Sequence, residues 1–161
     1  MCNPHTHELG QILAISAGEA HICVLQTDGC IICWGCNEDG QCSPPAGDHK
    51  YIAIAAGDRH TCAIQTDGTL ICFGRNDYGE CEVPPGCGPF ISVSAGEGHT
   101  CAVNIAGVVI AFGWNVFGQC NLPPNVVVDM NAQQALEEQA VARSKALGET
   151  FPTAESTCFE S

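Results

Sequence analysis

The sequence repeats itself three times at a fixed spacing of 39 residues, and this periodicity constrains the fold more than any other feature. At least eight positions carry the same residue in all three copies, without insertions or deletions between them. Two of these series are Gly18, Gly57, Gly96 and His21, His60, His99. A period near 40 residues is typical of repeat proteins, in which each copy forms one small structural unit.

Apolar residues within one copy alternate with a period of two, which predicts short β-strands rather than helices. In the middle copy Asp67-Gly68 separates two alternating runs, and such a pair is a strong signal for a tight hairpin. Pro84-Pro85 ends the copy, because proline lacks the backbone N–H that a strand ladder uses. We expect three strands in each copy and a short fourth strand near Cys81, which fits a propeller blade.

Three parts can be distinguished along the 161 residues. Residues 1–11 are similar to the end of a repeat, which indicates a piece of a longer repeat protein or a start codon within an older repeat. The repeats occupy residues 12–125 and divide at 12–50, 51–90 and 91–125. Residues 126–161 differ in composition, and a short helix from Ala132 to about Leu147 is expected there before a polar tail.

The recurring residues follow the pattern Ala-Gly-x-x-His, then a hairpin at Asp-Gly, then Cys-Trp/Phe-Gly-x-Asn-x-x-Gly-Gln/Glu. This pattern resembles the repeat of the RCC1 family (regulator of chromosome condensation) over roughly residues 12–124. The copies are shorter than the family's usual repeats and carry Cys where the family commonly has Leu. The resemblance implies an all-β fold, a partial RCC1-like β-propeller of three blades, followed by the short C-terminal helix and tail.

Three blades are too few to close a ring, because propellers typically use four to eight blades. An open arc leaves an uncovered sheet face at each end, and repeat proteins need such end faces to be capped. The C-terminal helix, a second copy or another protein could cover them. The predicted helix contains little Leu or Ile, so we expect the chain to be built into a larger assembly.

The charge balance argues against a nucleic-acid partner. Acidic residues outnumber basic ones 18 to 5, and the repeats contain only Lys50, Arg59 and Arg75 as cations. Binding to phosphates requires a basic face. A solvated acidic surface or a basic protein partner fits the composition better. Residues 1–11 contain no apolar run typical of a signal peptide, and no stretch is long enough to span a membrane, so an intracellular or organellar location is favoured.

The sequence contains 13 cysteines, which requires redox and metal chemistry to be considered. Cys23 and Cys33 lie symmetrically about one hairpin turn, and Cys62 and Cys72 about the next, so each pair would face across the ladder within reach of a disulfide. The alternative is that they are small buried apolar residues with free thiols. A metal site at Cys30-Ile-Ile-Cys33 is not expected, because residues three apart on a strand point to opposite faces.

No catalytic constellation stands out in the sequence. The recurring histidines are separated by a whole repeat, so we expect a structural role in which each bonds the adjacent loop backbone. We expect no catalytic residues, no metal and no cofactor, and thus a protein that is not an enzyme.

Positions that differ between the copies are candidates for specificity, because recurring positions build the scaffold. The third copy carries aromatic and apolar residues in a loop that propellers commonly use for contacts. The candidate partner-binding residues are Trp114, Val116, Phe117, Tyr78, Arg75 and Arg59. The alternative for Trp114 is that it packs under its own loop.

These patterns favour a non-enzymatic scaffold or interaction subunit of a larger assembly, contacting other proteins through its open flanks and loop rim. Short repeats of this kind are similar to those of some unicellular algae and bacteria, so an organelle membrane complex such as a photosystem supercomplex is one candidate host. The RCC1 resemblance implies an alternative, a guanine-nucleotide exchange factor-like regulator of a small GTPase. A secreted inhibitor-like propeller is a further alternative.

Overall fold

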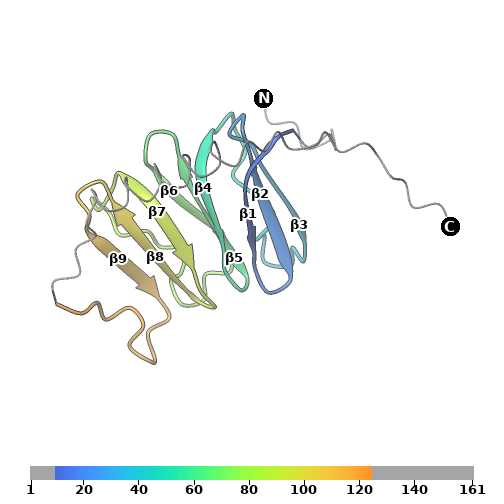
Figure 1. The fold of residues 1–161 in the computed structure, drawn as a ribbon. Coiled ribbons are helices and arrows are strands. Elements are labelled where there is room, and N and C mark those ends of the chain that lie inside the picture. The colour runs from blue at the N-terminus through green and yellow to red at the C-terminus, as the bar shows by residue number, and fades with distance from the viewer. Residues whose placement is uncertain (1–9, 125–161) are drawn as a thin grey trace, which may run out of the picture. The chain divides into compact units, whose positions relative to one another are not determined.

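The computed structural model describes residues 10–124, and this part of the chain is all-β. Nine strands form three separate antiparallel sheets, each with its strands in chain order, and Figure 1 shows the sheets side by side. The first sheet comprises β1 (Ile12–Ala17), β2 (His21–Gln26) and β3 (Ile31–Gly35). The second comprises β4 (Tyr51–Ala56), β5 (His60–Gln65) and β6 (Leu70–Gly74), and the third β7 (Phe90–Ala95), β8 (His99–Asn104) and β9 (Val109–Gly113). We call each sheet with its loops a blade.

The hairpin predicted at each Asp-Gly pair is confirmed. Gly29 and Gly68 both have a φ of 83°, a conformation that residues with a Cβ rarely adopt. Asp67 further fixes its turn, because its Oδ1 accepts the backbone N–H of Thr69 at 2.9 Å. In the third blade Asn104 takes over this role and accepts the N–H groups of Ala106 and Val108, each at 3.0 Å. In the third copy, Asn104 at the end of β8 therefore replaces the missing Asp as the side chain that fixes the hairpin turn.

The predicted fourth strand near Cys81 is wrong for the part of the chain that the structure describes. Cys81 lies in a turn, where its backbone N–H donates to Oδ1 of Asn76 at 2.9 Å. Cys42 and Cys120 make the same bond to their own asparagines, at 2.8 and 2.9 Å. Because the Asn side chain accepts the backbone N–H that the cysteine would need to pair with a neighbouring strand, this segment forms a loop rather than a fourth strand.

The core lies between successive sheets, which pack face to face. Between the first and second blades it contains Cys23, Leu25, Ile31, Tyr51 and Ala63, all buried. Between the second and third it contains Cys62, Ile64, Leu70, Phe90, Ala102 and Phe112. The second sheet is thus covered on both sides by its neighbours, and the arrangement is that of a partial propeller.

Two parts of the sequence prediction concern residues outside the described range, the lead-in at 1–9 and the helix and tail expected after residue 125. Among residues 10–124, no helix is long and apolar enough to cross a membrane.

Candidate interaction surfaces

A hydrogen-bonded relay connects each blade to the next. Nε2 of His21 lies 2.8 Å from Oγ1 of Thr61 on the following blade, and this hydroxyl donates at 2.8 Å to the backbone carbonyl of Gln41. The second interface repeats the arrangement, with His60 3.0 Å from Thr100, whose hydroxyl donates to the carbonyl of Glu80 at 2.8 Å. Each relay therefore joins two blades and the loop between them.

The relay defines the protonation of the histidine. The single proton of the Thr61 hydroxyl is used on a carbonyl, which can only accept, so Nε2 of His21 must donate. Burial, followed by the nearby His60, lowers the pKa of His21 and favours the neutral ring. The sequence indicated a structural role for the recurring histidines, but the expected bond from the histidine ring to the loop backbone is wrong for His21. Thr61 stands between the ring and that backbone.

The recurring glycines make room for this relay. A Cβ at Gly18 would collide with the carbonyl oxygen of Gly57 and with the ring of His21. A Cβ at Gly57 would meet the carbonyl of Gly96 and the ring of His60 in the same way. These glycines allow the loop of one blade to approach the next closely enough for the histidine to reach its threonine.

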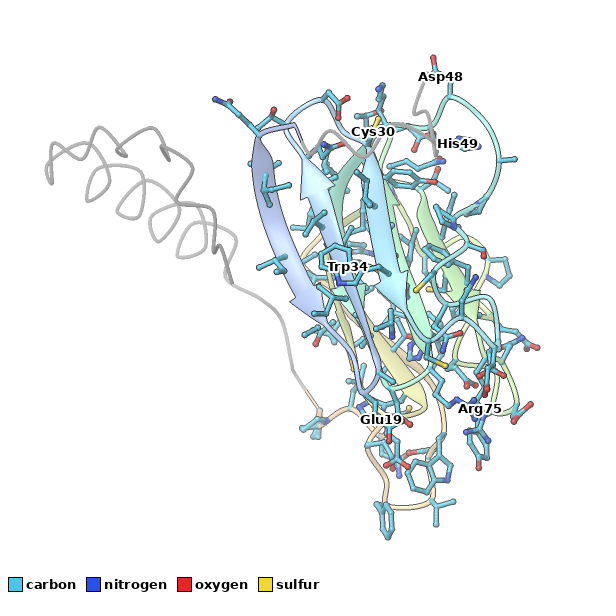
Figure 2. The ribbon with its side chains drawn as sticks, turned by 90° about the vertical axis from the view of Figure 1, so that its right-hand side faces the viewer. Glu19, Cys30, Trp34, Asp48, His49 and Arg75 are labelled. Atoms are coloured by element: carbon cyan, nitrogen blue, oxygen red, sulfur yellow. A yellow bond between two sulfur atoms is a disulfide. The ribbon has the colours of Figure 1, made fainter. Side chains whose placement is uncertain are left out.

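Aromatic side chains form a cluster on the loops that follow β6 and β9. The ring of Trp114 stacks on Tyr78 with centroids 5.7 Å apart, and Phe117 meets Trp114 edge-on at 5.3 Å. Cζ of Arg75 lies 5.3 Å from the centroid of Tyr78. We call Arg75, Tyr78, Trp114 and Phe117 the aromatic cluster. Figure 2 shows Arg75 at the same end of the molecule as Glu19.

The cluster is exposed although its loops are well ordered by hydrogen bonds. Phe117 is 81 % exposed, Val116 beside it 73 % and Tyr78 49 %. The backbone N–H of Tyr78 donates to Glu80 at 2.8 Å, and that of Phe117 donates to Gln119 at 2.9 Å. The loops therefore hold apolar rings in solvent on a fixed backbone.

Arg59 lies beside the cluster in the backbone, since its carbonyl oxygen accepts the N–H of Arg75 at 2.9 Å, but its side chain pairs with the preceding blade. Its guanidinium bridges to Asp39 at 2.9 Å and to Glu38 at 3.2 Å, which connects the loop of the second blade to that of the first. The structure thus brings together four of the six predicted partner-binding residues, with Val116 next to them, and places Arg59 in a tie between blades.

The two predicted cysteine pairs occupy equivalent places and differ in their bonding. Cys23 and Cys33 face each other across β2 and β3 and are joined by a disulfide, with Cα atoms 4.1 Å apart. Cys62 and Cys72 face each other in the same register and are both free thiols. Burial alone would raise the pKa of Cys62, but hydrogen bonds from Cys72, His60 and Thr100 outweigh it and lower the pKa. The same bond, together with burial, raises the pKa of Cys72.

Two further residues of interest escaped the sequence analysis. Thr61 and Thr100 each follow a recurring histidine directly, and this His-Thr pair was the available signal. Glu80 is fully buried, and its Oε1 has no hydrogen-bond partner among the described residues. The first copy carries Gln41 at the equivalent position, also buried.

Three packed antiparallel sheets joined by one repeated relay define a propeller-type repeat protein. The family model for the regulator of chromosome condensation (RCC1) repeat matches three times, at residues 12–41, 51–80 and 90–119. The chain belongs to this family. The comparison with curated proteins found no match.

Solved structures support the same fold. Prp20p from Saccharomyces cerevisiae, described with its binding to Gsp1p and histones, is 24% identical with a TM-score of 0.63, over 71% of this chain and 36% of its own. Human WBSCR16 is 23% identical with a TM-score of 0.62, over 76% and 37%. The ectodomain of the Physcomitrella patens receptor kinase CR4 is 27% identical with a TM-score of 0.58, over 66% and 30%. This chain spans about a third of the length of these proteins.

Proposed function

We propose that this RCC1-repeat chain is a non-enzymatic interaction protein that binds a protein partner through the aromatic cluster. One observation carries the proposal: Tyr78, Trp114 and Phe117 contact one another on fixed loops while Phe117 and Tyr78 remain largely exposed. Aromatic rings bury a large area at a small loss of side-chain entropy, and they are enriched among the residues that dominate protein interfaces. The three blades serve as the scaffold that positions these loops.

The charge of the chain indicates the chemistry of the partner. The sequence carries 18 acidic and 5 basic residues, so a partner surface with basic residues around an apolar anchor site would be complementary. Arg75 does not contradict this, because its guanidinium is paired with Asp77 at 2.7 Å and lies over Tyr78. The partner would therefore insert an apolar group against Phe117 and Trp114 and place its cations at the rim.

The test compares two variants of the full chain that each remove one exposed apolar side chain. Phe117→Ala removes the most exposed ring of the cluster, and Ile105→Ala removes a 63 % exposed side chain on a hairpin loop outside it. Proteins that co-purify with the chain from its native source are quantified by mass spectrometry. We expect at least one protein to fall about tenfold or more with Phe117→Ala and to stay with Ile105→Ala, as for a residue worth at least 1.4 kcal/mol. Identical protein sets for both variants would refute the assignment.

A regulator of a small GTPase is the second candidate. It is supported by the similarity in fold to Prp20p, which is described as binding Gsp1p. Nucleotide release from a small GTPase of the Gsp1p type, measured with and without the chain, tests it, and an unchanged rate argues against it. The expectation of a photosystem supercomplex or another organelle membrane complex gains no support from these relatives and stays a prediction.

A further inference from the structure

Two of the three blades place a pair of cysteines at the same point of their hairpins, and the two pairs differ in oxidation state. Cys23 faces Cys33 across β2 and β3, and a disulfide joins them. Cys62 faces Cys72 across β5 and β6 in the same register, and both are free thiols. Residues that face each other in this way have their side chains on the same side of the sheet, within the range that a disulfide spans. The second blade therefore holds a dithiol where the first holds a disulfide.

The surroundings of the two pairs are alike, so the fold accommodates either oxidation state. Sγ of Cys23, in the disulfide, lies 3.7 Å from Oγ1 of Thr61, and Sγ of Cys62, as a thiol, lies 3.5 Å from Oγ1 of Thr100. Both threonines accept the histidine of their relay and donate to a loop carbonyl at 2.8 Å. Closing the bond in the second blade would therefore leave the join to the third blade intact.

The two thiols of the second blade differ in their chemistry. Burial would raise the pKa of Cys62, but the hydrogen bonds from Cys72 and His60 outweigh it and lower the pKa to about 6. The hydrogen bond to Cys62, together with burial, raises the pKa of Cys72. Because the thiolate is the reactive form of cysteine, Cys62 is the nucleophile of the pair and Cys72 keeps the shared proton.

The packing around the pair restricts which oxidants can reach it. Cys62 is 0 % exposed and belongs to the core between the second and third blades, while Cys72 is half-buried at the edge of that core. Protein interiors are close-packed, so a bulky reagent cannot enter beside Cys72 without displacing its neighbours. This access favours a peroxide over a larger disulfide as the oxidant.

We propose that Cys62 and Cys72 form a redox site that hydrogen peroxide oxidises to a disulfide, that a small thiol restores, and that stabilises the second blade when oxidised. The sulfur of Cys62 attacks one oxygen of the peroxide, so that an S–O bond forms and the O–O bond breaks. The second oxygen leaves as hydroxide and takes a proton from solvent to become water.

The second step closes the disulfide. Sγ of Cys72 attacks Sγ of Cys62, the S–S bond forms and the S–O bond breaks. The departing hydroxide takes the proton of the Cys72 thiol and leaves as a second water. The two sulfurs lose two electrons and the peroxide gains them. In the reverse direction a dithiol reductant is oxidised to its own disulfide as the pair returns to two thiols.

The third blade supplies a matched control. Cys101 stands where Cys62 stands in the second blade, but it faces Ala111 instead of a second cysteine. Cys72→Ala introduces the same arrangement into the second blade, and the third blade shows that this hairpin accommodates an alanine there. The variant keeps the nucleophile and removes the thiol that closes the bond.

The first test treats the native full chain with hydrogen peroxide, denatures it in an alkylating reagent and maps the peptides by mass spectrometry. We expect the loss of two alkylatable thiols and a cross-linked Cys62–Cys72 peptide pair, which a bulky aromatic disulfide reagent should not produce in the native chain. In Cys72→Ala, oxidation of Cys62 should stop at the sulfenic acid or proceed to the sulfinic acid. Oxidation of Cys101 alone, with Cys62 and Cys72 both still alkylated, overturns the proposal.

The second test measures the thermal midpoint of the same samples. The disulfide restricts the unfolded chain, so the midpoint of the wild-type chain should rise by roughly 5 °C or more after peroxide. It should return when dithiothreitol reopens the bond. Cys72→Ala serves as the control, because it retains the Cys23–Cys33 disulfide and should not gain stability from peroxide. A cross-linked wild-type chain with an unchanged midpoint, or a cross-link that the reductant does not open, overturns the proposal whether or not the variant folds.

Discussion

Removing the hydroxyl of Thr61 is the most direct test of how the blades hold together. Thr61→Val keeps the shape of the side chain, but it leaves Nε2–H of His21 and the carbonyl of Gln41 without partners. His21 and Thr61 are 2 and 0 % exposed, so water cannot replace the bonds without opening the interface. An unsatisfied buried polar group costs about 1–3 kcal/mol, so we expect the free energy of unfolding to fall by about 2–6 kcal/mol for the two groups.

The assay is denaturant unfolding of the purified chain followed by circular dichroism, with the slope of the transition checked for constancy. A loss of about 3 kcal/mol corresponds to a fall in melting temperature of roughly 10 °C or more for a domain of this size. Thr66→Val is the matched control, because Thr66 is exposed in the hairpin loop and the same atoms are removed. We expect the control to change stability by less than about 0.5 kcal/mol.

A double-mutant cycle separates the relay from the packing around it. His21→Phe and Thr61→Val together replace both partners by apolar groups, which can be nearly neutral where each single change is costly. We expect a coupling energy of at least about 1 kcal/mol between the two positions. Additive effects, or a Thr61→Val chain as stable as the control, would show that the 2.8 Å contact contributes nothing and that apolar packing alone joins the blades.

Three further predictions concern buried groups. Glu80→Gln should raise the free energy of unfolding by about 1 kcal/mol in denaturant titrations, because the unpartnered Oε1 would no longer be part of a buried carboxyl group. Gln41 shows that an amide fits at this position. Equal or lower stability would count against this reasoning. Burial lowers the pKa of His21 below its ordinary value of 6.5, so the unfolded chain binds more protons than the folded chain on acidification. The free energy of unfolding should therefore fall as pH drops from 7 toward 5, and it should depend less on pH in a His21→Gln chain. Mild oxidation should join Cys62 to Cys72, because they face each other in the register that Cys23 and Cys33 occupy; peptide mapping should show the cross-linked pair, and two alkylatable thiols after oxidation would contradict it.

Much of the fold was predictable from local signals that repeat. The hairpin turns follow from Asp67-Gly68 and its equivalents, because the turn needs a positive φ that glycine adopts at little cost. The placement of Cys23 opposite Cys33 then follows, since the turn fixes the register of both strands, but their bond does not, because Cys62 and Cys72 share that register as free thiols. The length of the blade was less predictable. Nothing local showed that Asn76 would use the amide of Cys81 and thereby replace a fourth strand with a loop.

The candidate site was predictable in its composition and not in its geometry. The sequence indicated that Tyr78 and Trp114 occupy equivalent loops of neighbouring blades, but their stacking depends on how closely the blades approach. That approach is set by Gly57 and its equivalents, at which a Cβ would meet the backbone of the next blade. The same blade spacing explains why Thr61 was missed as the partner of His21. The bond joins residues 40 positions apart, beyond the reach of any local pattern.

The departures from the repeat point to the same surfaces as the exposed side chains do. The sequence contains two tryptophans, and each occupies a position that the other copies fill with a different residue. Trp34 replaces phenylalanine on the outward face of the first blade, and Trp114 replaces the Arg75 of the second copy beside the exposed ring of Phe117. Tryptophan is the side chain with the largest area to bury and is enriched at binding hot spots. Trp34 is 46 % exposed and Phe117 81 %, so both breaks in the repeat lie at the surface of the described blades, and the one at Trp114 and Phe117 is the contact on which the proposed partner binding depends.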